Sequence, residues 1–158
     1  MSSKAYVGRQ SSIARSDDGS PETWQLIGEV KDTAPGGETI DEYDSSNFDS
    51  GINKEFVTGM IDHGEVTVTM NHIPTNAGQQ LLRSDFQSGA RHTWGIKSPV
   101  SSIVSDSNTV PYYVTFEAFI KTLNLPKLGV AALAEASFIL KITGAVAEVQ
   151  EGTTTAPF

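Results

Sequence analysis

Alternation of apolar and polar residues with a period of two is the feature that most restricts how this chain can fold. In Ala134–Ile142 the even-numbered positions are all apolar and most odd-numbered positions are polar. This pattern is typical of a strand with one face on a core and the other in solvent. The same alternation recurs in three further windows, Trp24–Lys31, Glu65–Ile73 and Tyr112–Lys121, and more weakly in Ala5–Ala14 and Arg91–Ser98. The chain is therefore predicted to be mainly β and antiparallel.

One segment instead predicts a short α-helix. Asn76 suits the N-cap, Gln79 stands three residues later as a reciprocal capping partner, and Gly89 suits the C-terminal end. We expect the inner side of this helix to carry Ala77, Leu81, Leu82 and Phe86. The fold expected from these elements is an antiparallel β-sandwich or open barrel with one helix, in a single domain over residues 1–158.

Composition excludes several function classes. The net charge of −8 argues against sequence-independent binding of nucleic acid or of anionic membranes. The absence of cysteine excludes disulfides, thiol catalysis and cysteine-based metal clusters. The longest apolar run, Leu128–Ala134, is far shorter than a spanning helix, and the N-terminal region has no signal-like apolar stretch. We expect a soluble, non-secreted protein.

No catalytic or metal-binding motif stands out. The chain has no phosphate-binding loop, dinucleotide fingerprint or HExxH motif, and its three histidines are scattered. Asp62, His63 and Glu65 offer ligand types for zinc, but a solvated surface explains them as well. The acidic stretch Glu38–Asp49 does not fit the spacing of a calcium-binding EF-hand. We expect no enzyme activity, no metal and no cofactor.

Residues Ser45–Met60 lack periodicity and predict a long loop, which in a compact domain is often functional. The large apolar residues of this loop are unusual for a solvated segment: Phe48, Ile52, Phe56, Val57 and Met60.

Several local motifs follow one another in a specific order. They are Val30-Lys31-Asp32 with Pro35-Gly36, Glu42-Tyr43-Asp44, Val66–Met70 with Pro74, Gly78-Gln79-Gln80 with Leu81-Leu82, Phe86 and Gly89, and Trp94-Gly95-Ile96-Lys97. This order resembles the lambda-type major tail tube proteins of siphophages, the bacteriophages with long, non-contractile tails. The resemblance spans roughly residues 24–144. Some members of that family append an immunoglobulin-like domain, which we do not expect here.

The resemblance implies a structural virion protein whose hexameric rings stack into the tail tube that conducts DNA during genome ejection. The implied partners are further copies of the chain, the tape measure protein in the lumen, and the tail terminator and distal tail-tip proteins. Double-stranded DNA would pass without specific binding, and no membrane would be contacted. The protein would be assembled in the bacterial host cytoplasm and end in the virion tail.

The resemblance also implies roles for particular segments. Four strands per subunit would line the lumen within a ring-shaped β-barrel: Gly37–Asp44, Glu65–Ile73, Tyr112–Lys121 and Ala134–Ile142. The implied lumen-facing residues form a net acidic wall: Glu42, Asp44, Glu65, Glu117, Lys121, Glu135 and Lys141. Residues 45–60 would be a stacking loop anchored on the next ring by Phe48, Ile52, Phe56, Val57 and Met60, and residues 1–5 and 150–158 would be arms.

Other readings stay open. The same architecture serves the tube of a contractile tail, a tailocin, a gene transfer agent or a type VI secretion apparatus. A β-sandwich module that binds glycans or decorates capsids is a more distant alternative, in which the polar strand faces would be an ordinary wet surface.

Overall fold

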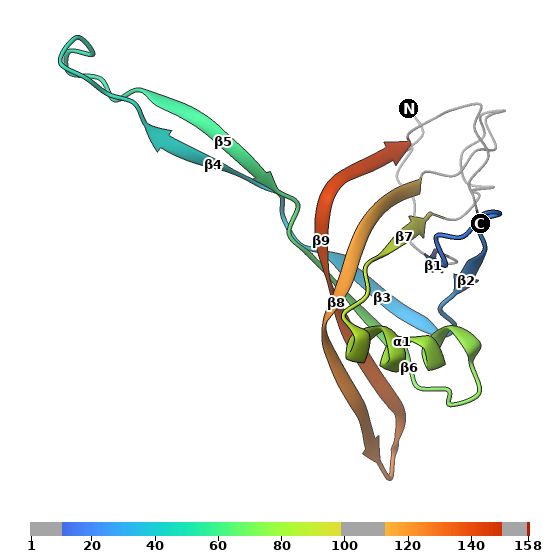
Figure 1. Cartoon of the computed structure of the whole chain (residues 1–158). Helices are drawn as coiled ribbons and strands as arrows, with labels where there is room; N and C mark the ends of the chain where they lie inside the picture. The colour runs from blue at the N-terminus through green and yellow to red at the C-terminus, as the bar shows by residue number, and fades with distance from the viewer. Residues whose placement is uncertain (1–10, 99–112, 150–157) are drawn as a thin grey trace, which may run out of the picture.

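The computed structural model describes residues 11–98, 113–149 and 158. These residues form a mainly β, antiparallel protein with one helix, as the alternation predicts (Figure 1). The elements are β1 (Ser12–Ser16), β2 (Trp24–Leu26), β3 (Val30–Pro35), β4 (Thr39–Asp44), β5 (Phe56–Asp62), β6 (Glu65–Asn71), α1 (Ala77–Ser88), β7 (His92–Lys97), β8 (Tyr113–Gly129) and β9 (Ala132–Val149). None of the helical structure in the described ranges is long and apolar enough to cross a membrane.

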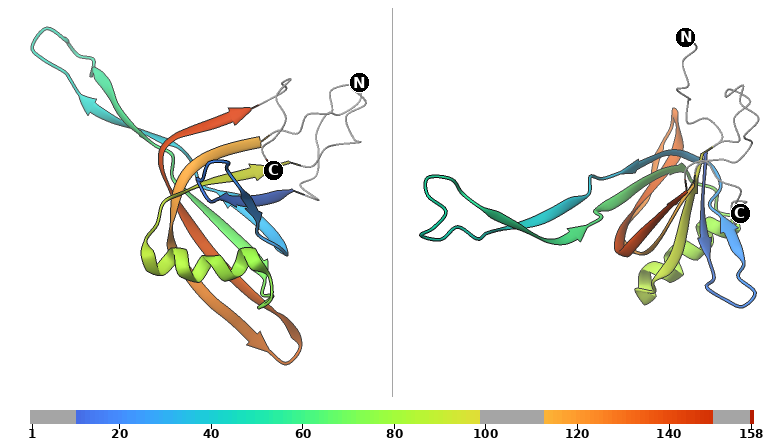
Figure 2. Two further views of the ribbon diagram at one scale, coloured as in Figure 1. Left: turned by 45° about the vertical axis from the view of Figure 1, so that its right-hand side comes forward. Right: turned by 90° about the horizontal axis from the view of Figure 1, so that it is seen from above.

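Seven strands form one sheet in the order β2-β1-β7-β8-β9-β6-β3, and β4 and β5 form a separate two-stranded hairpin. The hairpin projects away from the body, and the end of the β8–β9 hairpin points in a different direction (Figures 1 and 2). Strands β8 and β9 are by far the longest, with 17 and 18 residues, and they form the centre of the sheet.

Three predicted assignments differ from the structure. The window Trp24–Lys31 is not one strand, because residues 27–29 break it between β2 and β3. The position beside β6 in the sheet belongs to β3, whereas Gly37–Asp44, predicted to lie in this sheet, contributes β4 to the projecting hairpin. Part of the predicted loop Ser45–Met60 is also a strand, since β5 begins at Phe56. The hairpin has no core to impose a period of two, so its sequence does not alternate.

The sheet curls because its two edge strands are neighbours in sequence. Strands β2 and β3 stand at opposite ends of the strand order, yet only residues 27–29 connect them. The connection is held on both sides, because Ile27 N donates to Ile13 O at 3.0 Å and Asn71 N donates to Glu29 O at 2.9 Å. A sheet whose edges are linked so closely must bend into an open barrel.

The concave side of the curled sheet holds the core. Alternate positions of β6, β8 and β9 point inward, as predicted, and meet Trp94 from β7 and Leu82 from α1. Trp94 lies 5.8 Å from Phe138 between ring centroids, and both side chains are almost completely buried. The largest fully buried apolar side chains are Trp94, Phe138, Ile13, Leu82, Leu140, Val66 and Val68.

The predicted ends of the helix are confirmed. Asn76 is the N-cap and its Oδ1 accepts from Gln79 N at 3.1 Å. Gly89 ends the helix in the left-handed conformation, with a φ of 66°. The predicted inner side is only partly right: Leu82 is buried as predicted, but the other buried positions are Gly78, Gln79 and Asp85, and Ala77 and Phe86 are exposed.

The side chain of Gln79 does not complete a capping box. Its amide nitrogen donates to Gly28 O and Asn71 O, and its amide oxygen accepts from Ile73 N, all at 2.9 Å. This one buried amide joins α1 to the link between β2 and β3 and to the end of β6. A Cβ on the neighbouring Gly78 would lie 2.2 Å from Leu26 O, so only glycine lets the helix approach this closely.

A buried ion pair holds the other side of the helix. Asp85 accepts from Arg15 Nη2 of β1 at 2.8 Å, and both side chains are largely buried. Arg15 Nη2 also lies 2.8 Å from His92 Nε2 of β7. These contacts tie α1 to both strands, and they explain why an acidic residue occupies the inner side of the helix.

Replacing Gln79 by alanine is expected to lower the free energy of unfolding by about 2–4 kcal/mol, because three buried backbone groups lose their partner. The matched control is Gln80→Ala, which removes one exposed hydrogen bond to Pro74 O and should cost about 1 kcal/mol or less. Urea unfolding followed by tryptophan fluorescence measures both. Equal losses for the two variants would contradict the role of Gln79.

Candidate assembly surfaces

The β4–β5 hairpin presents large apolar side chains without a core of its own. Cross-strand pairs Ile40–Ile61 and Tyr43–Val57 each place two apolar residues on one face, and all four are more than half exposed. The five residues predicted from the loop lie here too and are exposed: Phe48, Ile52, Phe56, Val57 and Met60. Ile40, Tyr43 and Ile61 were missed, although Ile40 and Tyr43 are large apolar residues inside the acidic stretch Glu38–Asp49. An isolated two-stranded hairpin is marginally stable in water, so this surface suits a partner.

The end of the hairpin has a defined shape. Ser45 N donates to Glu55 O, Glu55 N donates to Ser46 Oγ, and Ser46 N donates to Asp44 Oδ1, each at 2.9 Å. The hydrogen bonds from Ser46 lower the pKa of Asp44. Phe48 and Ile52 have exposed fractions of 108% and 101%, so they project from an organised turn rather than packing on it. A surface of this kind needs little ordering when it binds.

The base of the hairpin is fixed to the sheet, and we call this region the neck. Asp62 Oδ1 accepts from Lys141 Nζ of β9 at 2.9 Å, and His63 Nδ1 lies 2.9 Å from Glu38 Oε1. The hydrogen bond from Lys141, aided by Gly64 N, lowers the pKa of Asp62. Gly64 has a φ of +77°, and a Cβ there would lie 2.7 Å from Gly37 O. The two backbone segments that form the neck therefore cross in close contact.

The polar side of β3, β6, β9 and β8 is the second surface. It carries Glu65, Glu117, Lys121, Glu135 and Lys141, five of the seven residues predicted to face a lumen. The other two, Glu42 and Asp44, lie on β4 in the hairpin and are not brought together with the five.

Charges on this polar side are paired across strands. Lys121 Nζ lies 2.5 Å from Glu65 Oε1, and Lys31 of β3 pairs with Glu135 of β9. The hydrogen bond from Lys31 lowers the pKa of Glu135. Glu117 is exposed. A carboxylate of the same chain pairs with each of the lysines Lys121, Lys141 and Lys31. These lysines are therefore less available to bind an external anion.

Phe119 and Ile139 belong to the same side and are partly buried. The strand register explains their setting: Ile120 pairs with Leu140 but Thr122 pairs with Ile139, so Lys121 is an extra residue in β8. A bulge of this kind changes the direction of side chains locally, which accounts for apolar residues on an otherwise polar face.

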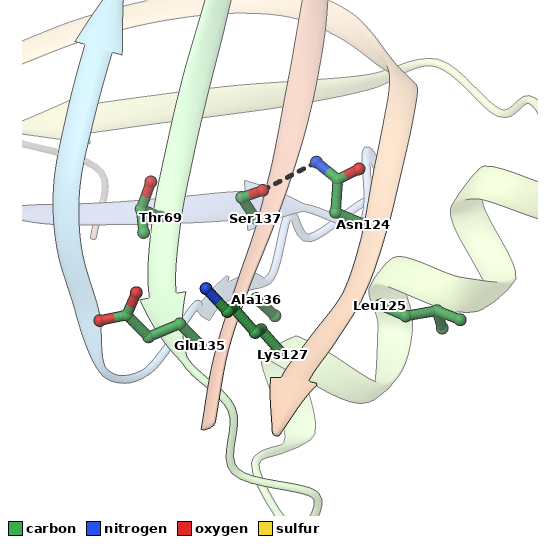
Figure 3. A pocket seen from close by; sticks show the side chains of 7 residues that line it. All are labelled: Thr69, Asn124, Leu125, Lys127, Glu135, Ala136 and Ser137. Carbon is green, nitrogen blue, oxygen red and sulfur yellow. Dashed lines mark hydrogen bonds between the residues drawn. The ribbon is translucent and has the colours of Figure 1, made fainter. Parts of the chain in front are cut away.

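A third surface, the end of the β8–β9 hairpin, is apolar and exposed. It contains Leu125, Leu128, Val130 and Leu133, which the sequence analysis did not single out. A shallow open cleft of about 250 Å³ lies beside it, lined by residues of β6, β8 and β9 (Figure 3). Asn124 Nδ2 donates to Ser137 Oγ at 2.8 Å across this cleft. The cleft has few enclosing walls, so it suits a side chain of a partner better than an enclosed ligand.

The three residues considered for zinc do not converge. Asp62 binds Lys141, His63 binds Glu38 and Glu65 binds Lys121, so each is engaged separately. Within residues 11–98, 113–149 and 158, no three His, Asp or Glu side chains gather as metal ligands. Of the two predicted arms, residues 1–5 and 150–157 lie outside the described residues.

Comparison with known structures identifies the fold. The tail tube of phage SPP1 has a TM-score of 0.65 at 17% identity, and the match covers 94% of this chain and 80% of that chain. The tail of an empty gene transfer agent particle with C6 symmetry gives 0.65 at 13% identity, covering 92% and 100%. A component of the sheath/tube terminator structure of an extracellular contractile injection system gives 0.67 at 12% identity, covering 94% and 99%. At these identities the likeness shows the fold alone.

Comparison by sequence adds the family. No curated protein matches the chain. The profile of the lambda phage tail tube protein family, however, matches residues 7–121, which is most of the chain and includes the hairpin, the helix and the first half of β8. The sequence resemblance is thereby confirmed, and this chain belongs to the lambda phage tail tube protein family.

Proposed function

We propose that this chain is the subunit of the tube of a long, non-contractile phage tail, in which hexameric rings stack and the β4–β5 hairpin joins each ring to the next. The observation that carries the proposal is the hairpin itself. It exposes eight large apolar side chains on a ribbon without a core: Ile40, Tyr43, Phe48, Ile52, Phe56, Val57, Met60 and Ile61. Only contact with another molecule removes this surface from water.

The free edges of the sheet support lateral assembly. No described strand pairs with the outer side of β3, and β7 pairs with β8 only as far as Ala118. The outer edge of β8 from Phe119 to Gly129 therefore lacks a strand neighbour among the described residues. Each protomer then offers the four-strand unit β3-β6-β9-β8 with an open edge on each side. Because the unit is antiparallel and has an even number of strands, β3 of one copy meets β8 of the next antiparallel.

The dimensions of such a ring suit a DNA conduit. Six four-strand units make about 24 strands, and a spacing of about 4.8 Å with a tilt near 40° gives a circumference of roughly 150 Å. The backbone diameter is then about 48 Å, and side chains reduce the bore to about 38 Å. A DNA duplex passes through a bore of this size.

The paired charges on the polar side support passage without sticking. If this side lines the bore, its lysines Lys31, Lys121 and Lys141 already face carboxylates, so few cations remain for phosphate. The predicted acidic excess is smaller than the sequence suggests, since Glu42 and Asp44 lie on the hairpin. Five predicted positions remain, with three acids and two bases. Near-neutral pairing, rather than strong repulsion, would keep the wall non-adhesive.

This role is structural and not enzymatic. We propose the tape measure protein as the occupant of the lumen during assembly, and terminator and distal tail-tip proteins as partners at the two ends of the tube. Assembly would take place in the bacterial host cytoplasm. The nearest second candidate is the tube of a contractile or gene-transfer apparatus, because structures of both kinds share the fold. A sheath gene beside the gene for this chain, or a visible sheath, separates the two.

Replacing Phe48 and Ile52 together by aspartate is expected to abolish tube formation while leaving the protomer folded. Both side chains are fully exposed in the protomer, so their loss costs no packing there. The matched control is Phe86→Asp, which changes an exposed aromatic residue on α1. Sedimentation and negative-stain microscopy measure the tubes. Tubes of normal length from the double variant would contradict the role of the hairpin. Deleting residues 46–54 removes the end of the hairpin but leaves β5 in place, and it is likewise expected to abolish tube formation.

Cysteine pairs test the lateral edges, because the chain contains no cysteine of its own. Thr33→Cys on β3 is combined with a single cysteine at each of positions 119–127 of β8 in turn. For the β8 position that faces Thr33 of the next copy, we expect a non-reducing gel to show a ladder of disulfide-linked oligomers. The ladder should end at six subunits. Thr33→Cys with Ser12→Cys on β1 is the control. A ladder with the control pair alone would place the contact elsewhere.

The neck makes assembly sensitive to acid. The lowered pKa of Asp62 means that its contact with Lys141 is fully present above the ordinary Asp value of 3.8 and is lost as pH falls through the still lower folded value. We expect Asp62→Asn to reproduce this loss at neutral pH, with faster hydrogen exchange in β4 and β5. Asp41→Asn, on the same hairpin, is the control. Unchanged exchange in Asp62→Asn would show that the neck is held by other contacts.

A further inference from the structure

Phe158 occupies a specific position on the outer side of the sheet. Its ring stacks on Trp24 of β2, with centroids 4.9 Å apart and planes at 30°. Lys97 Nζ of β7 lies 5.0 Å from the ring centroid and also donates a hydrogen bond to the main-chain oxygen of Phe158. In Figure 1 the label for this end of the chain lies beside β1 and β2. Phe158 thus makes three kinds of contact with residues more than 60 positions away.

The sheet is hollowed where the ring lies. Gly95 and Lys97 are two apart on β7 and share the face opposite to the buried Trp94. A Cβ on Gly95 would lie 2.2 Å from Phe158 Cε1 and 3.2 Å from Trp24 Cζ3. Ala14 pairs with Gly95 on the same face and is completely buried, although it points away from the core. We call the recess bounded by Trp24, Gly95 and Lys97 the aromatic slot.

We propose that the aromatic slot is a binding site for a phenyl side chain, filled by Phe158 of the same chain, and that this contact fastens Phe158 to the outer face of β1, β2 and β7. This inference goes beyond the proposed function and does not depend on it. Three residues define the chemistry of the ligand. The indole of Trp24 stacks on the ring, and the ammonium group of Lys97 contacts both the ring and the adjacent main-chain oxygen. Gly95 has no side chain and so leaves room for the ring.

The chain reaches its own slot easily. Val149 at the end of β9 pairs with Tyr113, and Tyr113 pairs with Lys97. The end of β9 is therefore about two strand spacings, or about 10 Å, from the slot. Residues 150–158 can span up to about 30 Å when extended. Occupation within one chain needs no strain, and the short strand β2 gains a packing partner on its exposed side.

The two tryptophans make a direct test possible, because Trp24 lies in the slot and Trp94 lies in the core. Full-length protein labelled with 5-fluorotryptophan gives two ¹⁹F resonances. Phe158→Ala is expected to shift the Trp24 resonance and leave the Trp94 resonance unchanged. Gly95→Ala, which expels the ring and places a methyl group 3.2 Å from Trp24 Cζ3, is expected to shift the Trp24 resonance as well. The double variant should give the same Trp24 resonance as Gly95→Ala alone, because the ring is already absent from the slot. Phe48→Ala, an exposed phenylalanine on the hairpin, should move neither resonance.

Hydrogen exchange gives a second readout. Loss of a stacked aromatic pair is expected to speed exchange of the β2 amides about tenfold, because such a pair contributes up to about 1.5 kcal/mol. An unchanged Trp24 resonance in Phe158→Ala would overturn the proposal. So would restoration of the Trp24 resonance in labelled Phe158→Ala protein on mixing with unlabelled wild type, since that result assigns the slot to Phe158 of a second copy.

Discussion

The three residues that join β2 to β3 connect opposite ends of a seven-stranded sheet, and the rest of the fold follows from that connection. A sheet whose edges are tied together at one point has to curl, so alternate side chains of β6, β8 and β9 meet on its inner side. The helix closes the same end, where the Gln79 amide satisfies three backbone groups, one in the link and two at the end of β6. The polar side of the sheet is left facing outward, with Lys31, Lys121 and Lys141 already paired with carboxylates.

The β4–β5 hairpin is stabilised by different contacts from those of the body of the protein. In the part of the chain that the structure describes it has no third strand and no core, yet its end is ordered by hydrogen bonds between Ser45, Ser46 and Glu55, and its neck is fixed by the pair Asp62–Lys141. A rigid arm with exposed Phe48 and Ile52 is costly for a solitary protein in water. The same arm binds with little loss of conformational freedom when a partner is present. The family membership and the geometry of the hairpin therefore support each other.

Sequence reasoning succeeded where a core imposes a pattern. The strands β6 and β7, the core-facing halves of β8 and β9, and both ends of α1 were predicted, because burial of one face and capping chemistry act on nearby residues. It failed where tertiary contacts decide. Asp85 lies on the inner side of the helix only because Arg15 of β1 meets it, and Gln79 turns away from its cap to bind Gly28 and Asn71. Strand β5 was predicted as loop, since a ribbon exposed on both faces carries no period.

The length of β8 and β9 has a mechanical consequence. The two strands run through the centre of the sheet and form the exposed end of their own hairpin, and Lys141 on β9 also holds the neck of the other hairpin. Backbone hydrogen bonds between antiparallel strands lie perpendicular to the strand direction. A force pulling along β9 therefore loads many of these bonds in shear at the same moment, whereas a force across the sheet opens them one at a time. The protomer is stiffest along the axis of its two longest strands.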